Sequence, residues 1–94
     1  MFYILAQDKM TMVPVDDDDV IRVVPGYPIT GKFNVGVQNI NDYVSCETPS
    51  IFVACYASKE KVQAMMSRLA ALRVQSENGV YSDYYIAPME EDVK

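Results

Sequence analysis

The chain has 94 residues, of which half are hydrophobic and 22% are charged, a balance that supports one folded domain and excludes a disordered chain. The formal net charge is −5 and only eight Lys and Arg residues are present, so we expect no nucleic-acid binding, which depends on clustered basic side chains. The sequence contains no histidine, which excludes Ser-His-Asp and Cys-His catalysis and removes most zinc sites.

The N-terminal region predicts a hairpin. Residues 2–7 are aromatic and β-branched, and residues 10–15 follow after the polar pair Asp8-Lys9, so both segments are predicted strands. Pro14 cannot donate to a ladder, which places the second strand at a sheet edge. The apolar opening is too short for a signal peptide or a membrane span, so we expect a soluble, cytoplasmic protein.

The middle of the chain continues the strand pattern. Residues 20–24 form a predicted third strand, which the Pro25-Gly26-Tyr27-Pro28 turn ends. Residues 31–38 alternate between apolar and polar side chains, which predicts a strand with one face in water. Gly36 within it indicates a bulge or a sharp bend.

Two further strands are predicted before the helix. Residues 43–47 form the fifth, and residues 50–57 are apolar on both faces, which favours a central position in the sheet. If these two strands form a hairpin, Cys46 and Cys55 lie too far apart for a disulfide. They are predicted to be free thiols, as in a reducing compartment.

The periodicity then changes to 3.6 residues over 59–77, which predicts one amphipathic helix lying on the sheet. Ser58 is the predicted N-cap, Glu60 suits the helix dipole in the first turn, and Gly79 marks the end. The helix is predicted to cover the core with Val62, Met65, Met66, Leu69 and Leu72.

Residues 80–87 return as a last strand, and residues 88–94 form a predicted acidic, solvated tail of the single domain 1–94. The overall prediction is an α+β fold: a curled antiparallel β-meander of about five to seven short strands, with one helix over 59–77 and a C-terminal strand. A parallel α/β fold is disfavoured because each parallel crossover normally needs its own helix.

Several residues invite a chemical interpretation, and each has a structural alternative. Cys55 precedes the helix by a few residues and could be an activated nucleophile, but its apolar strand favours a structural thiol. Carboxylate pairs such as Asp42 with Glu47, or Asp83 with Glu90, have almost no specificity as acid and base. Four aspartates suggest a cation loop, although consecutive acids without a turning glycine favour a solvated turn: Asp16, Asp17, Asp18 and Asp19.

Seven tyrosines are the notable compositional excess, since tyrosine suits both interfaces and half-buried sheet faces. In the last strand, Val80, Ser82, Tyr84 and Ile86 alternate with Tyr81, Asp83 and Tyr85. We assign the first set to the core side. The second set, Tyr81, Asp83 and Tyr85, is then the predicted partner-binding surface.

Three segments resemble a group of short, uncharacterised proteins of Gram-positive bacteria that are often encoded near prophage or other mobile-element genes. The opening Tyr3-Ile4-Leu5-Ala6-Gln7-Asp8-Lys9 is similar to that group's strand ending in Ser-Gln-Asp/Asn-Lys, and Cys55 to Val62 is similar to its Gly-x-Tyr-x-Ser/Thr-x-Glu-x-Ala helix start, with Cys55 in place of Gly. The closing Tyr84-Tyr85-Ile86-Ala87-Pro88 resembles its Tyr-x-Met-Pro ending. The resemblance implies a sheet, one helix and a last strand, and it implies no activity.

From these observations we expect a non-enzymatic protein-binding or accessory protein, encoded on a mobile element, that acts through a sheet face or edge and needs no cofactor. The expected partner is another protein or a second copy, and no membrane is involved. A small-molecule or peptide-binding barrel-like domain, with its ligand between sheet and helix, is the alternative hypothesis. An enzyme that uses Cys55 or carboxylates is a third.

Overall fold

The structure is a computed structural model that describes residues 2–44, 48–49, 51–77 and 84–93. In this part of the chain the elements are β1 (Phe2–Leu5), β2 (Met12–Val15), β3 (Asp19–Pro25), β4 (Phe33–Asn39), α1 (Ile40–Val44), β5 (Ile51–Tyr56), α2 (Lys59–Glu77), β6 (Tyr84–Ile86) and a short 3-10 turn, η1 (Glu90–Asp92).

The described strands form two three-stranded sheets, ordered β2-β1-β6 and β3-β4-β5. All pairs are antiparallel except β1 with β6, which is parallel. The chain reaches β6 only after the second sheet and α2, which act together as the crossover that a parallel pair needs. The predicted α+β class, main helix and last strand are therefore confirmed, whereas the strands form two sheets and the last one joins in parallel.

Gln7 connects the two sheets just after β1 ends. Its backbone N–H donates to the carbonyl of Val53 in β5. Its side-chain amide accepts from the Cys55 N–H at 2.9 Å and donates to the carbonyl oxygens of Cys55 at 3.3 Å and Pro88 at 2.9 Å. The prediction that 50–57 is central was wrong, since β5 ends its sheet, and Gln7 satisfies polar groups that this edge would otherwise leave unpaired.

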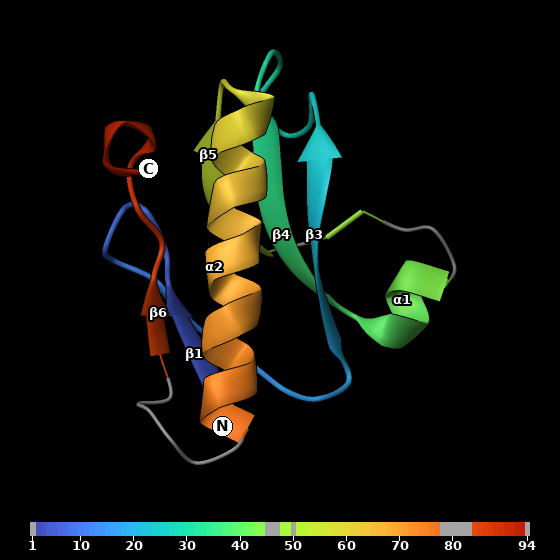
Figure 1. The fold of residues 1–94 in the computed structure, drawn as a ribbon. Helices are drawn as coiled ribbons and strands as arrows, with labels where there is room; N and C mark the ends of the chain where they lie inside the picture. The colour runs from blue at the N-terminus through green and yellow to red at the C-terminus, as the bar shows by residue number, and fades with distance from the viewer. Residues whose placement is uncertain (1, 45–47, 50, 78–83, 94) are drawn as a thin grey trace.

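The core lies where α2 packs against the two sheets (Figure 1). The helix contributes Val62, Met65 and Leu69, each at most 2% exposed, which confirms the predicted apolar stripe. Its start is also confirmed, because the Ser58 hydroxyl accepts from the Lys61 N–H at 3.3 Å.

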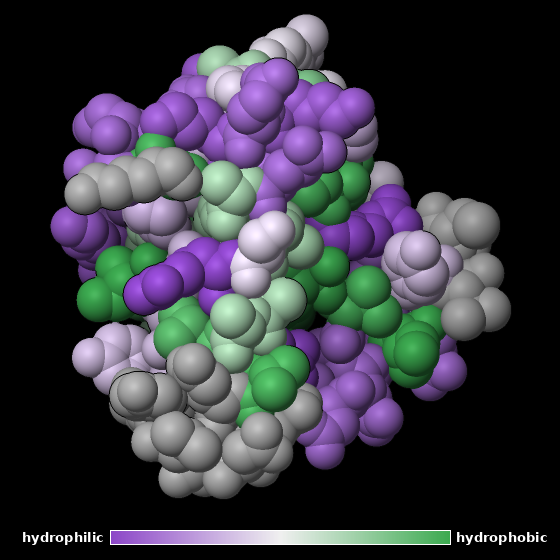
Figure 2. Space-filling model, in the orientation of Figure 1, coloured by the Kyte–Doolittle hydropathy of each residue, from purple (hydrophilic) through white to green (hydrophobic). Residues whose placement is uncertain are grey.

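The helix covers only part of the sheet β3-β4-β5. In Figure 2, polar side chains gather over the first turns of α2, and hydrophobic side chains show between α2 and α1. Ile21 and Val23 of β3 are partly buried and pack against the core cluster.

Strand β4 is buried on both sides, contrary to the predicted wet face. Asn34 is 1% exposed, and its amide lies 3.2 Å from the carbonyl oxygens of Val24, Ile29 and Lys32. The buried amide is stable there because it donates hydrogen bonds to the carbonyl groups of the preceding turn.

The predicted irregularity at Gly36 is confirmed by a shift of register between Val35 and Gly36 in the pairing of β4 with β5. A Cβ added to Gly36 would lie 2.6 Å from the Cβ of Pro49, so a larger residue does not fit there.

The strand predicted over 43–47 was wrong, because residues 40–44 form α1 and residues 45–47 lie outside the described residues. The Asn39 side chain accepts from the Asn41 N–H at 2.9 Å, which caps the helix. Asp42 in the first turn suits the helix dipole. These local interactions outweigh the strand propensity of Tyr43.

The residues after β6 pack on the domain rather than forming a solvated tail. The Pro88 carbonyl accepts from the Tyr56 hydroxyl at 2.8 Å, and Val93 is 6% exposed. The Glu90 carboxylate accepts from the backbone N–H groups of Ala57 and Ser58 at 3.0–3.2 Å. These two hydrogen bonds lower the pKa of Glu90 below its usual value, with the Ala57 bond contributing most.

Candidate functional site

Of the three predicted partner-binding residues, the structure describes only Tyr85, and it is not exposed. Tyr85 is only 8% exposed and faces the core, whereas Tyr84 and Ile86 face outward, so the predicted assignment of faces was reversed. Backbone pairing decides it, since the Ala87 N–H donates to the Leu5 carbonyl and fixes the register of β6 beside β1. Tyr81 and Asp83 lie outside the described residues.

The opposite side of this sheet carries an apolar surface, which we call the outer face. Met12 is 56% exposed, Tyr84 51%, Ile86 47% and Tyr3 37%. Pro14 is also exposed and Leu5 is partly buried. None of the six strand positions on the outer face carries a charge: Tyr3, Leu5, Met12, Pro14, Tyr84 and Ile86.

Strand pairing arranges these side chains in two rows across the sheet. Tyr3 lies opposite Pro14 on one side and Tyr84 on the other. Leu5 lies between Met12 and Ile86 in the same way. Ordinary strand spacings give a footprint of about 10 by 7 Å between the outermost Cα atoms. The outer face is therefore a contiguous, uncharged apolar surface and a candidate interaction surface.

Acidic groups border the outer face at one end. The positions that alternate outward along β2 continue past Pro14 to Asp16, and Asp16, Asp17 and Asp18 are all exposed. The Asp19 carboxylate accepts from the Asp16 N–H at 2.8 Å, and the Asp19 N–H donates to the Asp16 carbonyl at 3.0 Å, which closes the turn. Within the described residues, no group of three or more His, Cys, Asp or Glu side chains could hold a metal ion.

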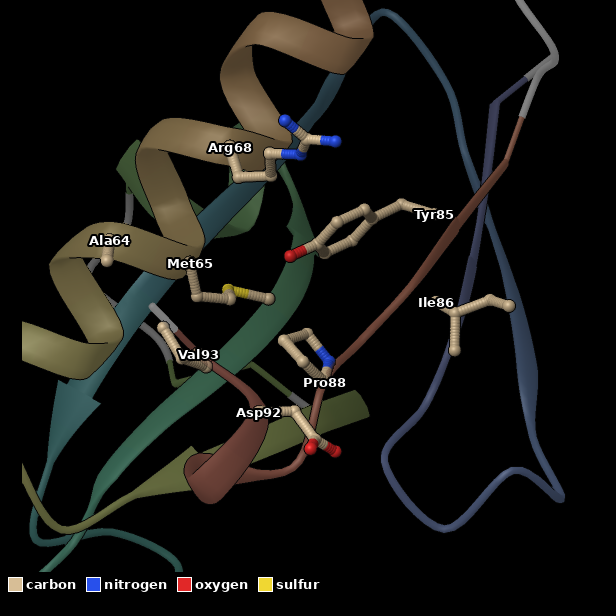
Figure 3. Close-up of a pocket in the computed structure, with 8 residues that line it drawn as sticks. All are labelled: Ala64, Met65, Arg68, Tyr85, Ile86, Pro88, Asp92 and Val93. Atoms are coloured by element: carbon tan, nitrogen blue, oxygen red, sulfur yellow. The ribbon is translucent and has the colours of Figure 1, made fainter.

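A second candidate site is a cleft of about 510 Å³ on the inner side of β6, beside α2. Ala64, Met65 and Arg68 line it from the helix, and Pro88 and Val93 line it from the C-terminal segment. Its remaining lining residues are Tyr85, Ile86 and Asp92. Figure 3 shows the Tyr85 ring extending toward α2, whereas the Ile86 side chain points to the opposite side of β6.

The polar groups of this cleft lie at defined places. In Figure 3 the Tyr85 hydroxyl points between Met65 and Arg68, and Asp92 lies toward the opposite end of the cleft from Arg68. Burial raises the pKa of Tyr85, and the Arg68 charge opposes this effect, so the hydroxyl is protonated at neutral pH. Arg68 and Asp92 are exposed.

Cys55, the sequence-derived candidate nucleophile, has a structural environment. It is a free, partly buried thiol, and its backbone N–H and carbonyl both bond to Gln7. Cys46 lies outside the described residues. Glu90, one of the candidate acids, has a structural role. Its carboxylate accepts hydrogen bonds from the backbone N–H groups of Ala57 and Ser58, just before α2.

Comparisons with known proteins give no further guidance. The chain matches no protein-family model, no curated protein and no solved structure. In the part of the chain that the structure describes, no helix has the length and apolar character that a membrane crossing requires.

Proposed function

We propose that this chain is a non-enzymatic accessory module that binds another protein through the outer face of the sheet β2-β1-β6. The observation that supports it is the pair of uncharged rows, Pro14-Tyr3-Tyr84 and Met12-Leu5-Ile86, left open to solvent. Tyrosine and methionine are enriched in interfaces, where charged side chains are depleted. The exposed apolar side chains here adjoin one another across three strands rather than lying scattered, as in interaction sites.

The partner we propose has an apolar surface bordered by Lys or Arg. The chain carries a net charge of −5, and exposed aspartates border one end of the outer face. A basic border on the partner would complement this charge and accelerate association. A second copy would bring like charges together, which disfavours self-association through this face.

The proposed surface can be tested by site-specific photo-crosslinking in cells that express the protein. The variant Tyr84→p-benzoylphenylalanine places a crosslinker on the outer face, and Tyr43→p-benzoylphenylalanine is a matched control at a similarly exposed tyrosine (51% and 45%) on α1. We expect one heterologous protein to crosslink from position 84 and not from position 43, through an apolar segment flanked by basic residues. Equal crosslinking from both positions, crosslinks only to a second copy, or none at all would contradict the proposal.

The proposal also includes the cytoplasmic location and the mobile-element origin expected from the sequence. Neither affects the choice of surface. Fractionation of the expressing cells, with the protein recovered in the soluble cytoplasmic fraction, would support the first.

A further inference from the structure

The cleft between α2 and β6 has the size and the chemistry of a small-molecule site. Its volume of about 510 Å³ lies within the ~300–1,000 Å³ typical of ligand pockets. Met65 and Val93, which are 1% and 6% exposed, provide an apolar floor, and Pro88 adds to it.

One polar group in the cleft is placed to contact a ligand. Tyr85 is more than nine-tenths buried, and its hydroxyl is directed into the cleft (Figure 3). The hydroxyl of Tyr56, the neighbouring buried tyrosine, donates to Pro88, whereas that of Tyr85 has no hydrogen-bond partner among the described residues. The Tyr85 ring is thus buried while its hydroxyl opens into the cleft, where a ligand oxygen can accept from it.

The charges on the two sides of this hydroxyl determine the class of ligand. The Arg68 guanidinium lies on the Tyr85 side of the cleft, and the Asp92 carboxylate lies toward the other end. A carboxylate near Arg68 would accept from both the guanidinium and the Tyr85 hydroxyl, which are strong donors to an anion. A second anionic group at the far end would be repelled by Asp92.

We propose that this cleft binds an amphipathic monocarboxylic acid. Its carboxylate lies against Arg68 and the Tyr85 hydroxyl, and its hydrocarbon part lies over Met65 and Val93. This site is separate from the outer face, because Tyr85 and Ile86 point to opposite sides of β6. The two sites share only Ile86, and the substitutions that test the cleft, at Arg68, Tyr85, Ala64 and Asp92, leave the outer face unchanged.

The test uses octanoate, with octanol and octanedioate as comparators, and follows the methyl signals of Met65 and Val93 by NMR titration of the full chain. Octanoate should shift both signals in a saturable manner and bind more tightly than octanol, which lacks the charge. Octanedioate should bind more weakly, and Asp92→Asn should restore part of its affinity. No saturable shift with octanoate, or equal affinity for octanoate and octanol, would overturn the proposal.

Variants then test the two donors. Arg68→Gln should weaken octanoate binding by about five- to tenfold, at the lower end for a charge-assisted hydrogen bond because the side chain is exposed. Tyr85→Phe keeps the buried ring and should weaken binding by about threefold or more. Arg73→Gln is the matched control on the same helix, since Arg73 lies over the Phe2 ring outside the cleft, and it should bind octanoate like the wild type.

A variant that fills the cleft tests whether octanoate binds in the cleft or at another apolar surface. Ala64 lines the cleft from α2 and is partly exposed, so Ala64→Leu should block octanoate while the circular dichroism spectrum stays that of the folded chain. Unchanged octanoate affinity in Arg68→Gln or in Ala64→Leu would show that octanoate binds elsewhere, which overturns the assignment.

Discussion

The two faces of the sheet β2-β1-β6 are both apolar, yet they differ in what covers them. The inner face consists of Phe2, Ile4, Val13, Val15 and Tyr85, all at most 8% exposed. The outer face has side chains of the same chemical kind, and four of them are 37–56% exposed. Hydropathy alone thus does not distinguish a core face from a binding face. In the part of the chain that the structure describes, α2, the second sheet and the C-terminal residues pack on the inner face.

The largest expected effect comes from comparing the same substitution on the two faces. Ile4→Ala removes a side chain that is 0% exposed and should lower the free energy of unfolding by about 2–5 kcal/mol. Ile86→Ala, on the outer face of the same sheet at 47% exposed, should cost less than about 1 kcal/mol. Urea denaturation measures both, and equal losses would mean that the outer face is also core.

The next largest effect should come from Gln7, whose hydrogen bonds connect the two sheets beside the inner face. Gln7→Leu removes the side-chain hydrogen bonds to Cys55 and Pro88 and should lower the free energy of unfolding by about 1–3 kcal/mol. Gln63→Leu on the exposed side of α2 is the matched control, with an expected change of about 0.5 kcal/mol or less. If Gln7→Leu were as mild as the control, the two sheets would not depend on this residue.

A pH-dependent effect tests the C-terminal residues on the inner side. The folded pKa of Glu90 is lowered, so its carboxylate stabilises the fold above the unfolded pKa of about 4.3. This contribution is lost as pH falls through the lower folded pKa. Glu90→Gln should therefore be less stable than the wild type at pH 7, and this difference should be smaller at pH 2.

The control for this comparison is Glu91→Gln, which changes the neighbouring exposed acid. Thermal unfolding at the two pH values should show the wild-type midpoint for Glu91→Gln at pH 7. A difference between Glu90→Gln and the wild type that is the same at both pH values would contradict the electrostatic origin.

The smallest effect on stability should come from the outer face itself. The double variant Tyr3→Ser/Tyr84→Ser removes two half-exposed rings and should lower the free energy of unfolding by less than about 1 kcal/mol per site, within the span of strand propensities. Chemical denaturation checks this. A loss above about 3 kcal/mol would mean that these rings pack in the core.

Local signals were enough to predict much of the fold. The 3.6-residue stripe and the Ser58 cap predicted α2 with its observed bounds, Lys59–Glu77. Pro14 indicated an edge strand, and β2 is at the edge of its sheet. Gly36 indicated the irregularity in β4, where a side chain would meet Pro49.

The failed predictions depend on contacts between residues distant in the chain. The parallel pairing of β6 with β1 determines which sides of the sheet Tyr84 and Tyr85 lie on. The packing of the C-terminal residues depends on a hydrogen bond from Gln7 to Pro88, which lies 81 residues later in the chain. Two exposed tyrosines, Tyr3 and Tyr84, do share a sheet face. Because both sides of β6 are apolar, alternation alone could not assign Tyr84 and Tyr85 to their faces. The exposure of Tyr3 could have been predicted from the sequence. Residues 2–5 are apolar on both sides of the strand, so an apolar side chain had to lie on the outer side as well.

The most direct test of the outer face as a binding surface is quantitative affinity capture from cells with three tagged forms of the protein. These are the wild type, Tyr3→Ser/Tyr84→Ser (37% and 51% exposed), and the control Tyr27→Ser/Tyr43→Ser, which removes two exposed tyrosines elsewhere (53% and 45%). We predict that a partner enriched with the wild type and the control is lost from the outer-face variant, although that variant stays folded. Retention of the partner by the folded outer-face variant, or its loss from the control alone, would contradict the proposed binding surface.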